Sequence, residues 1–206
     1  MLLGGTCPKN LGRGKRFTIA IIVGQKKGTW TRSWNFLKKD GDHEWHMIDG
    51  TIIRAHRHAA GALGGQEQQE LGRSCGGFSS KIHAKVDALG MPLGFIITPG
   101  QSSDIGQAEA LVGEELCESL LADKGYDSNT FREFLQNRGI VPVVPGKRNR
   151  IESIEYDAHT YKERNAVERF FGRIKEYRRI ATRFDKTVAM FRAGLVLASI
   201  LMWIKL

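Results

Sequence analysis

Apolar runs of strand length alternate along the chain with longer stretches that have helical spacing. Strands are predicted at Trp45–Ile53, Ile82–Ala88, Pro92–Thr98, Ser119–Ala122 and Ile140–Val144. Helices are predicted at Thr29–Leu37, Ile105–Glu118, Asn129–Asn137 and Thr187–Trp203. The second and third strands are joined at Leu89-Gly90-Met91, which is typical of a hairpin. A hairpin followed by alternating strands and helices predicts an α/β fold, with a mixed sheet of about five strands flanked by helices.

Two stretches give no regular pattern. The segment Ala59–Ser79 is rich in glycine, glutamine and serine and is predicted to be a long loop. Residues 1–28 show one apolar run and no convincing period.

The basic stretch Tyr161–Arg179, YKERNAVERFFGRIKEYRR, is predicted to form one long helix. Thr160 and Glu163 match a capping box, which places the start of the helix at Tyr161. At about 100° per residue, one polar stripe of the helix holds Tyr161, Arg164, Glu168 and Lys175. The apolar residues lie on the adjacent face and can pack on a core. The stripe is either a solvated charged face or a catalytic carboxylate beside cations that bind phosphate.

Two aspartates stand where a strand is expected to be buried. Asp49 interrupts the run Met47–Ile53, and Asp123 follows Leu120-Leu121-Ala122. A buried carboxylate costs several kcal/mol unless it is paired or bound to metal. The carboxyl ends of adjacent parallel strands meet at one edge of a sheet, so the two aspartates are expected to lie together there with Glu168.

Three carboxylates in one cleft repel each other, and a divalent cation removes that problem. Oxygen ligands favour Mg²⁺ or Mn²⁺, and such sites commonly hold two ions about 3.5–4 Å apart. For each aspartate alone, a turn or cap role is the alternative. Such structural roles are also the interpretation of the remaining candidate acids, with Asp87 in the hairpin, Asp104 and Asp157 at helix caps and Asp127 in a turn.

The charge balance favours an anionic partner. The 206 residues include 31 Lys and Arg against 22 Asp and Glu, a formal net charge of +9. Nucleic acid is the common partner of such a chain, and the apolar run at residues 194–204 is too short to cross a membrane. The widely spaced Cys7, Cys75 and Cys117 indicate a reducing compartment. His56 and His58 with Cys75 match no structural zinc spacing.

The residues Tyr161, Arg164, Glu168 and Lys175 fit the pattern Tyr, two residues, Arg, three residues, Glu, six residues, Lys. Upstream lie MIDGTIIRAH, GRSCGGFSSKIHAKVDALG and LLADKGYDS. With these segments the chain resembles the DDE transposases of bacterial insertion sequences, in the family five branch of the family four-like group. The resemblance implies a ribonuclease H-like fold in which Asp49, Asp123 and Glu168 hold Mg²⁺ or Mn²⁺. Arg164 and Lys175 would hold DNA phosphates, and Tyr161 would support the active site or the DNA end.

The resemblance also implies cleavage and strand transfer on double-stranded DNA, at transposon ends and target, by a homodimer in the bacterial cytoplasm on the nucleoid. Basic side chains expected to contact that DNA are Arg169, Arg173, Arg178 and Arg179. Residues 38–206 are predicted to be the catalytic domain. The N-terminal DNA-binding region that this branch usually carries is expected to be lacking, with residues 1–37 at most a remnant of it, which predicts a truncated copy or a second reading frame.

Two alternatives remain from the sequence. The chain could be a catalytically silent remnant that binds DNA or regulates a full-length transposase, or a stand-alone nuclease of the same fold. A buried acid such as Asp49 argues against a protein that only binds DNA.

Overall fold

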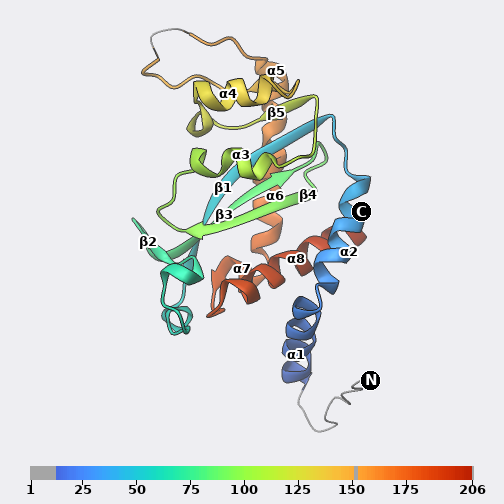
Figure 1. Cartoon of the computed structure of the whole chain (residues 1–206), viewed down its shortest axis with the longest axis vertical. Helices are drawn as coiled ribbons and strands as arrows, with labels where there is room; N and C mark the ends of the chain where they lie inside the picture. Colours follow the sequence, from blue (N-terminus) through green and yellow to red (C-terminus); the bar gives the residue numbers. More distant parts are fainter. Residues whose placement is uncertain (1–12, 151–152, 206) are drawn as a thin grey trace.

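A single mixed sheet forms the centre of the molecule (Figure 1). The computed structural model describes residues 13–150 and 153–205. Strands β1 (Trp45–Ala55), β3 (Gly77–Val86) and β4 (Pro92–Pro99) form an antiparallel meander. Strands β5 (Ser119–Leu121) and β6 (Val141–Val143) then add to the other side of β1, parallel to it.

The order β4-β3-β1-β5-β6, in which β3 runs against the other strands beside it, is the ribonuclease H-like arrangement, so the expected fold is confirmed. Two short strands complete the seven-stranded sheet. β2 (Gly72–Ser74) extends the edge of β3, and β7 (Thr182–Arg183) pairs with the end of β1.

Helices cover both faces of the sheet because neighbouring residues of β1 point to opposite sides. Met47 packs with Phe170 of α6 (Asn165–Lys175) and Leu195 of α8 (Val188–Ile204) in one core cluster. Ile48 packs in a second cluster, which contains residues of α3 (Ala108–Val112) and α4 (Asn129–Gln136). The two cores fix the sheet between two layers of helices.

The long helix predicted at Tyr161–Arg179 is wrong in detail. The chain forms α5 (Ala158–Tyr161), a 3-10 turn at Lys162–Arg164, α6, and a separate α7 (Arg178–Ala181). The predicted capping box is also wrong, because the side chain of Asp157 caps α5 by accepting hydrogen bonds from the backbone N–H groups of His159 and Thr160, at 2.8 and 3.1 Å. The cap role predicted for Asp157 is thereby confirmed.

Two other predictions need correction. The helix expected at Ile105–Glu118 is a 3-10 turn followed by α3, which stops at Gly113 because that residue has a φ of 64°, a value that favours glycine. The predicted loop at Ala59–Ser79 contains β2 and the first residues of β3.

Two N-terminal helices, α1 (Arg13–Lys26) and α2 (Thr29–Leu37), pack against α8. Trp34 of α2 is buried in the core of the sheet, and its indole N–H donates to the carbonyl of Pro92 at 3.1 Å. The domain boundary after residue 37 stays a prediction, and residues 1–12 lie outside the described residues. Across the part of the chain that the structure describes, no helix is long and apolar enough to cross a membrane.

Candidate active site

The pairing of β1 with β5 brings Asp49, in the middle of β1, beside Asp123 at the edge formed by the carboxyl end of β5. In that parallel pair Met47 lies opposite Leu121, and each aspartate follows two residues later on its chain. The expectation that the strands of these two aspartates are adjacent and parallel is therefore confirmed. The side chain of Asp49 is 22% exposed, so its carboxylate is half-buried at this edge.

Arg164 links the strand to the helix. Its Nη1 lies 3.2 Å from Oδ2 of Asp49, and its Nη2 pairs with Oε1 of Glu168 one helical turn away. The guanidinium also lies 5.8 Å from the centre of the Tyr161 ring. Three members of the predicted stripe thus meet each other and β1, although the helix is interrupted.

The pKa of Asp49 is raised above its usual value. Burial is the main cause, and the nearby negative charges of Asp123 and Asp104 add to it. The backbone N–H of Gly50, at 2.7 Å, and the charge of Arg164 act in the opposite direction. This edge of the sheet therefore concentrates negative charge and favours a cation.

Lys175, the last member of the stripe, also reaches β1. Its Nζ donates to Oγ1 of Thr51 at 2.6 Å, two residues beyond Asp49. Burial lowers the pKa of Lys175, and the charge of Asp49 opposes that shift. The ammonium therefore stands beside the acids.

A fourth acid, Asp104, belongs to this region, and the sequence interpretation missed it. Asp104 makes no side-chain cap, so the predicted cap role is wrong. Its Oδ2 lies 2.6 Å from Nζ of Lys81 and its Oδ1 lies 3.2 Å from Nδ1 of His83. The only sequence signal was a pair of ionisable residues, Lys81 and His83, within an apolar strand.

Gly50 allows Asp104 to lie against β1. A Cβ at this position would stand 2.1 Å from Oδ1 of Asp104, a distance that no side chain can occupy. The residue after Asp49 must therefore be a glycine as long as Asp104 keeps this position.

Tyr126 is a second residue missed from the sequence. Its side chain is buried, and its hydroxyl has no hydrogen-bond partner among the described residues. Burial raises the pKa of Tyr126, and the charges of Asp104, Asp49 and Asp123 raise it further. The phenol thus lies close to all three aspartates and remains protonated.

The loop that follows Asp123 is held by Asp127. The Asp123 carboxylate accepts from the backbone N–H of Gly125 at 2.8 Å. The side chain of Asp127 is only 1% exposed and pairs with Arg132 and Arg150, at 3.0 and 2.6 Å. Asp127 is therefore the buried centre of an ion-pair cluster and more than a turn residue.

Asp87 does hold the β3–β4 hairpin, as predicted, by accepting from the backbone N–H groups of Leu89 and Met91.

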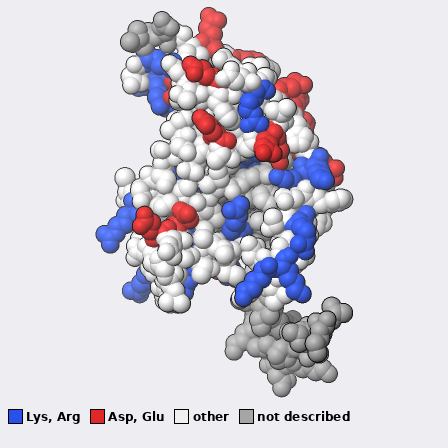
Figure 2. Space-filling model, in the orientation of Figure 1, with Lys and Arg blue, Asp and Glu red and all other residues white. Residues whose placement is uncertain are grey.

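The other basic residues predicted to contact DNA lie in different surroundings. Arg169 and Arg178 are exposed. Arg173 donates to the carbonyl of Gly90 at 3.0 Å, and Arg179 pairs with Asp185. On the face shown in Figure 2, basic and acidic side chains are mixed and form no continuous basic surface.

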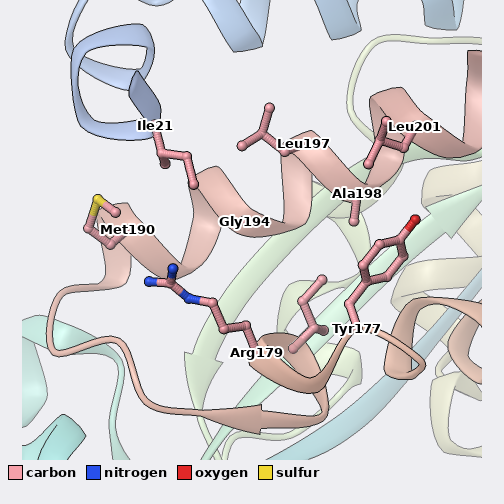
Figure 3. Close-up of a pocket in the computed structure, with 9 residues that line it drawn as sticks. Ile21, Tyr177, Arg179, Met190, Gly194, Leu197, Ala198 and Leu201 are labelled. Atoms are coloured by element: carbon pink, nitrogen blue, oxygen red, sulfur yellow. The ribbon is translucent and has the colours of Figure 1, made fainter. Parts of the chain in front are cut away.

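Arg179 also borders an apolar cavity of about 200 Å³ between α1, α7 and α8, away from the acids (Figure 3). Its wall includes Ile21, Met190 and Leu197. This cavity lacks the chemistry that a catalytic centre requires.

The donor set at the edge of the sheet fits a hard divalent cation. Asp49, Asp123 and Glu168 offer only carboxylate oxygens, which Mg²⁺ and Mn²⁺ prefer. Within the described residues, no three His, Cys, Asp or Glu side chains already converge as metal ligands. Arg164 supplies the positive charge between Asp49 and Glu168, so a metal shared by these two acids would compete with that guanidinium.

Comparisons with known proteins agree on one family. The family described as "Transposase DDE domain" matches residues 42–203. A Brucella ovis protein named as a transposase for insertion sequence element IS6501 is 36% identical over 132 residues, which cover 62% of this chain and 99% of that protein. A Burkholderia cepacia protein named as a transposase for insertion sequence element IS402 is 32% identical over 130 residues, 57% of this chain and 59% of its own length.

Among solved structures, a piggyBac transposase synaptic complex with hairpin DNA is similar over 77% of this chain and 47% of its own. With a TM-score of 0.46 and 11% identity, that likeness is too distant to support an argument about this chain.

Proposed function

This chain belongs to the transposase DDE domain family of insertion sequences, and from that premise we propose that Asp49, Asp123 and Glu168 are its catalytic acids. The observation that carries the proposal is the meeting of β1, β5 and α6. The two aspartates follow in-register positions of parallel strands, and Arg164 spans from Asp49 to Glu168. The reaction would be cleavage of a phosphodiester at the element's end, followed by attack of the freed 3′-hydroxyl on target DNA.

The three acids would hold Mg²⁺ or Mn²⁺, up to two ions. When bound, such ions activate the attacking oxygen and stabilise the leaving oxygen of a phosphodiester. The raised pKa of Asp49, caused chiefly by burial, is consistent with a carboxylate that gains from a nearby cation.

The chain's own cations would orient the DNA. Lys175 lies along β1 from Asp49, and Arg164 lies directly on it, so both can contact phosphates next to the bond that is cut. Tyr161 packs against Arg164 and would fix its direction. Arg169, Arg173, Arg178 and Arg179 are proposed as outer DNA contacts, for which Arg173 and Arg179 would have to exchange their present partners.

The proposed partners are double-stranded DNA at the transposon ends and at the target, bound by a homodimer that acts on the nucleoid in the bacterial cytoplasm. We further propose that residues 38–206 form the catalytic domain and that residues 1–37 are a remnant of a DNA-binding region, of which α1 and α2 pack against α8. This division predicts that the separately expressed 38–206 fragment folds, although it loses the contacts of Trp34.

The test is strand cleavage of duplexes that carry the element's terminal sequences, with Mg²⁺ or Mn²⁺ added. Asp49→Asn, Asp123→Asn and Glu168→Gln are each expected to lower cleavage by about 10³-fold, the scale of losing a major electrostatic stabiliser. Asp40→Asn is the matched control, because Asp40 is exposed on the turn before β1.

Near-normal cleavage by Glu168→Gln would contradict the assignment of the third acid. DNA that the unmodified protein retards in a gel but never cuts would instead support the catalytically silent alternative. Cutting without preference for terminal sequences would support a general nuclease.

A further inference from the structure

A second groove lies further along β1. It encloses about 310 Å³, and its lining is Ile52, Arg54, Ser74, Gly76, Ser79, Lys175 and Ala181. We propose that this groove binds the sugar–phosphate backbone of one DNA strand on its way to or from the acids. The proposal rests on the proposed function and adds a binding site formed by the β2–β3 hairpin.

The register of the sheet places most of the groove on the face of β1 that Asp104 contacts. Arg54 lies opposite Ser79 across β1 and β3, so the two side chains share a face of the sheet. Gly50 points to the same face four residues earlier, where Asp104 lies against it. Asp49 and Thr51 point to the opposite face, where they contact Arg164 and Lys175. The groove thus lies on the face of Asp104, and it reaches the face of Asp49 where Lys175 lines it.

Lys175 connects the two places because one edge of β1 is open. On that side β1 pairs with β5 up to Met47 and with β7 from Arg54 onward, so the described structure leaves the stretch between them without a strand neighbour. Lys175 comes from α6 to this edge, where it bonds to Thr51 and lines the groove. One ammonium therefore borders both the acids and the groove.

The lining has the chemistry of a phosphate site. Arg54 is exposed and takes part in none of the ion pairs formed among the described residues. The hydroxyls of Ser74 and Ser79 lie 2.8 Å apart on the floor. Arginine, lysine and serine side chains are the usual contacts to DNA phosphates. Ile52, 48% exposed, offers an apolar surface to a deoxyribose.

The dimensions match a single strand of a duplex. A β-strand rises roughly 3.3 Å per residue, so Arg54 lies about 16 Å along β1 from Asp49. Successive phosphates of one strand are closer together than this distance, so Arg54 would meet the same backbone a few nucleotides from the acids.

The alkylation rate of Cys75 can be used to test DNA binding in the groove of the unsubstituted protein. Its thiol is exposed and lies between the lining residues Ser74 and Gly76. We expect a 30-base-pair duplex, at a concentration that gives full retardation in a gel, to slow alkylation of Cys75 by iodoacetamide at least about fivefold, as measured by peptide mass spectrometry. An alkylation rate that stays unchanged at full retardation would overturn the proposal.

A matched pair of variants gives a second test. Arg54→Gln is expected to weaken duplex binding five- to tenfold and to reduce the slope of log affinity against log salt by about one, because one phosphate contact is lost. Arg192→Gln removes the same charge from an exposed position on α8 that lines a different pocket, and it should change affinity less than twofold.

These outcomes separate the groove from the catalytic assignment. Arg54→Gln should lower cleavage at low DNA concentration in proportion to its weaker binding, whereas Glu168→Gln should bind DNA normally and fail to cut it. If Arg54→Gln binds DNA like Arg192→Gln, with the same salt slope, the groove is not a DNA site. The catalytic assignment would be unaffected by that result, because it is tested by the cleavage activity of Glu168→Gln.

Discussion

Replacing Asp127 by asparagine should destabilise the fold at neutral pH and disturb the loop that carries Asp123. Oδ1 of Asp127 accepts from Nε and Nη2 of Arg132, each at 3.0 Å, and Oδ2 accepts from Nε of Arg150 at 2.6 Å. The backbone N–H of Lys147 adds a further bond at 2.8 Å. The carboxylate thus ties α4 and the loop after β6 to the turn that follows Asp123.

The magnitude follows from the pKa of this carboxyl. Burial opposes ionisation, but the hydrogen bonds from Arg150, Lys147 and Arg132 outweigh it and lower the pKa of Asp127 to about 2. A gap of about two units from an unfolded value near 4 corresponds to roughly 2.5 kcal/mol. Asparagine also leaves Arg132, which is 8% exposed, without its counter-charge, so the loss is expected to be about 3 kcal/mol at pH 7.

Because the folded pKa is lowered, the stabilisation is complete above the unfolded pKa and is lost as the pH falls through the folded pKa. The difference between Asp127→Asn and the unmodified protein should therefore be full at pH 7 and shrink between about pH 4 and pH 2. Urea unfolding followed by tryptophan fluorescence measures it, with Asp40→Asn as a control that should stay within about 0.5 kcal/mol. Equal urea midpoints at pH 7, or a difference that does not change with pH, would refute the reasoning.

Two further substitutions test the surroundings of the acids. Gly50→Ala places a Cβ 2.1 Å from the present position of Oδ1 of Asp104, so Asp104 must move. We expect DNA cleavage to fall about 10²-fold while gel retardation is retained. Unchanged cleavage would show that the position of Asp104 is irrelevant to the reaction. Tyr126→Phe removes a buried hydroxyl that has no partner among the described residues, so the free energy of unfolding in urea should rise by about 1 kcal/mol, and a fall would mean that the hydroxyl makes a stabilising contact.

The placement of Asp49 and Asp123 was predictable because it depends on local order. Asp49 lies inside an apolar run of strand length and Asp123 directly follows another, and such runs in an α/β chain are expected to become neighbours in one sheet. The face of Glu168 was predictable for a similar reason. Glu168 and Arg164 are one turn apart, and the apolar residues beside them, such as Phe170, can only point to the core.

The role of Asp104 could not be read from the sequence, because its partners Lys81 and His83 come from a strand more than 20 residues away. Its approach to β1 also depends on a missing Cβ at Gly50, and a single glycine in a strand has several explanations. The start of this helical segment was misplaced because Asp157 and Thr160 both fit a cap, and only the structure shows which side chain accepts the bonds.

The charges along β1 explain how one strand can serve both chemistry and binding. At Asp49 the carboxylate faces Arg164, at Thr51 the ammonium of Lys175 arrives from α6, and at Arg54 the strand itself supplies a guanidinium. Positive charge thus follows the carboxylate along β1 within about 16 Å, first at Lys175 on the same face and then at Arg54 on the opposite face. Like charges repel, so a DNA strand held by Lys175 and Arg54 keeps most of its phosphates away from the carboxylates. Only the phosphate that is cut must approach the carboxylates, and a divalent cation lowers the repulsion between that phosphate and the carboxylates.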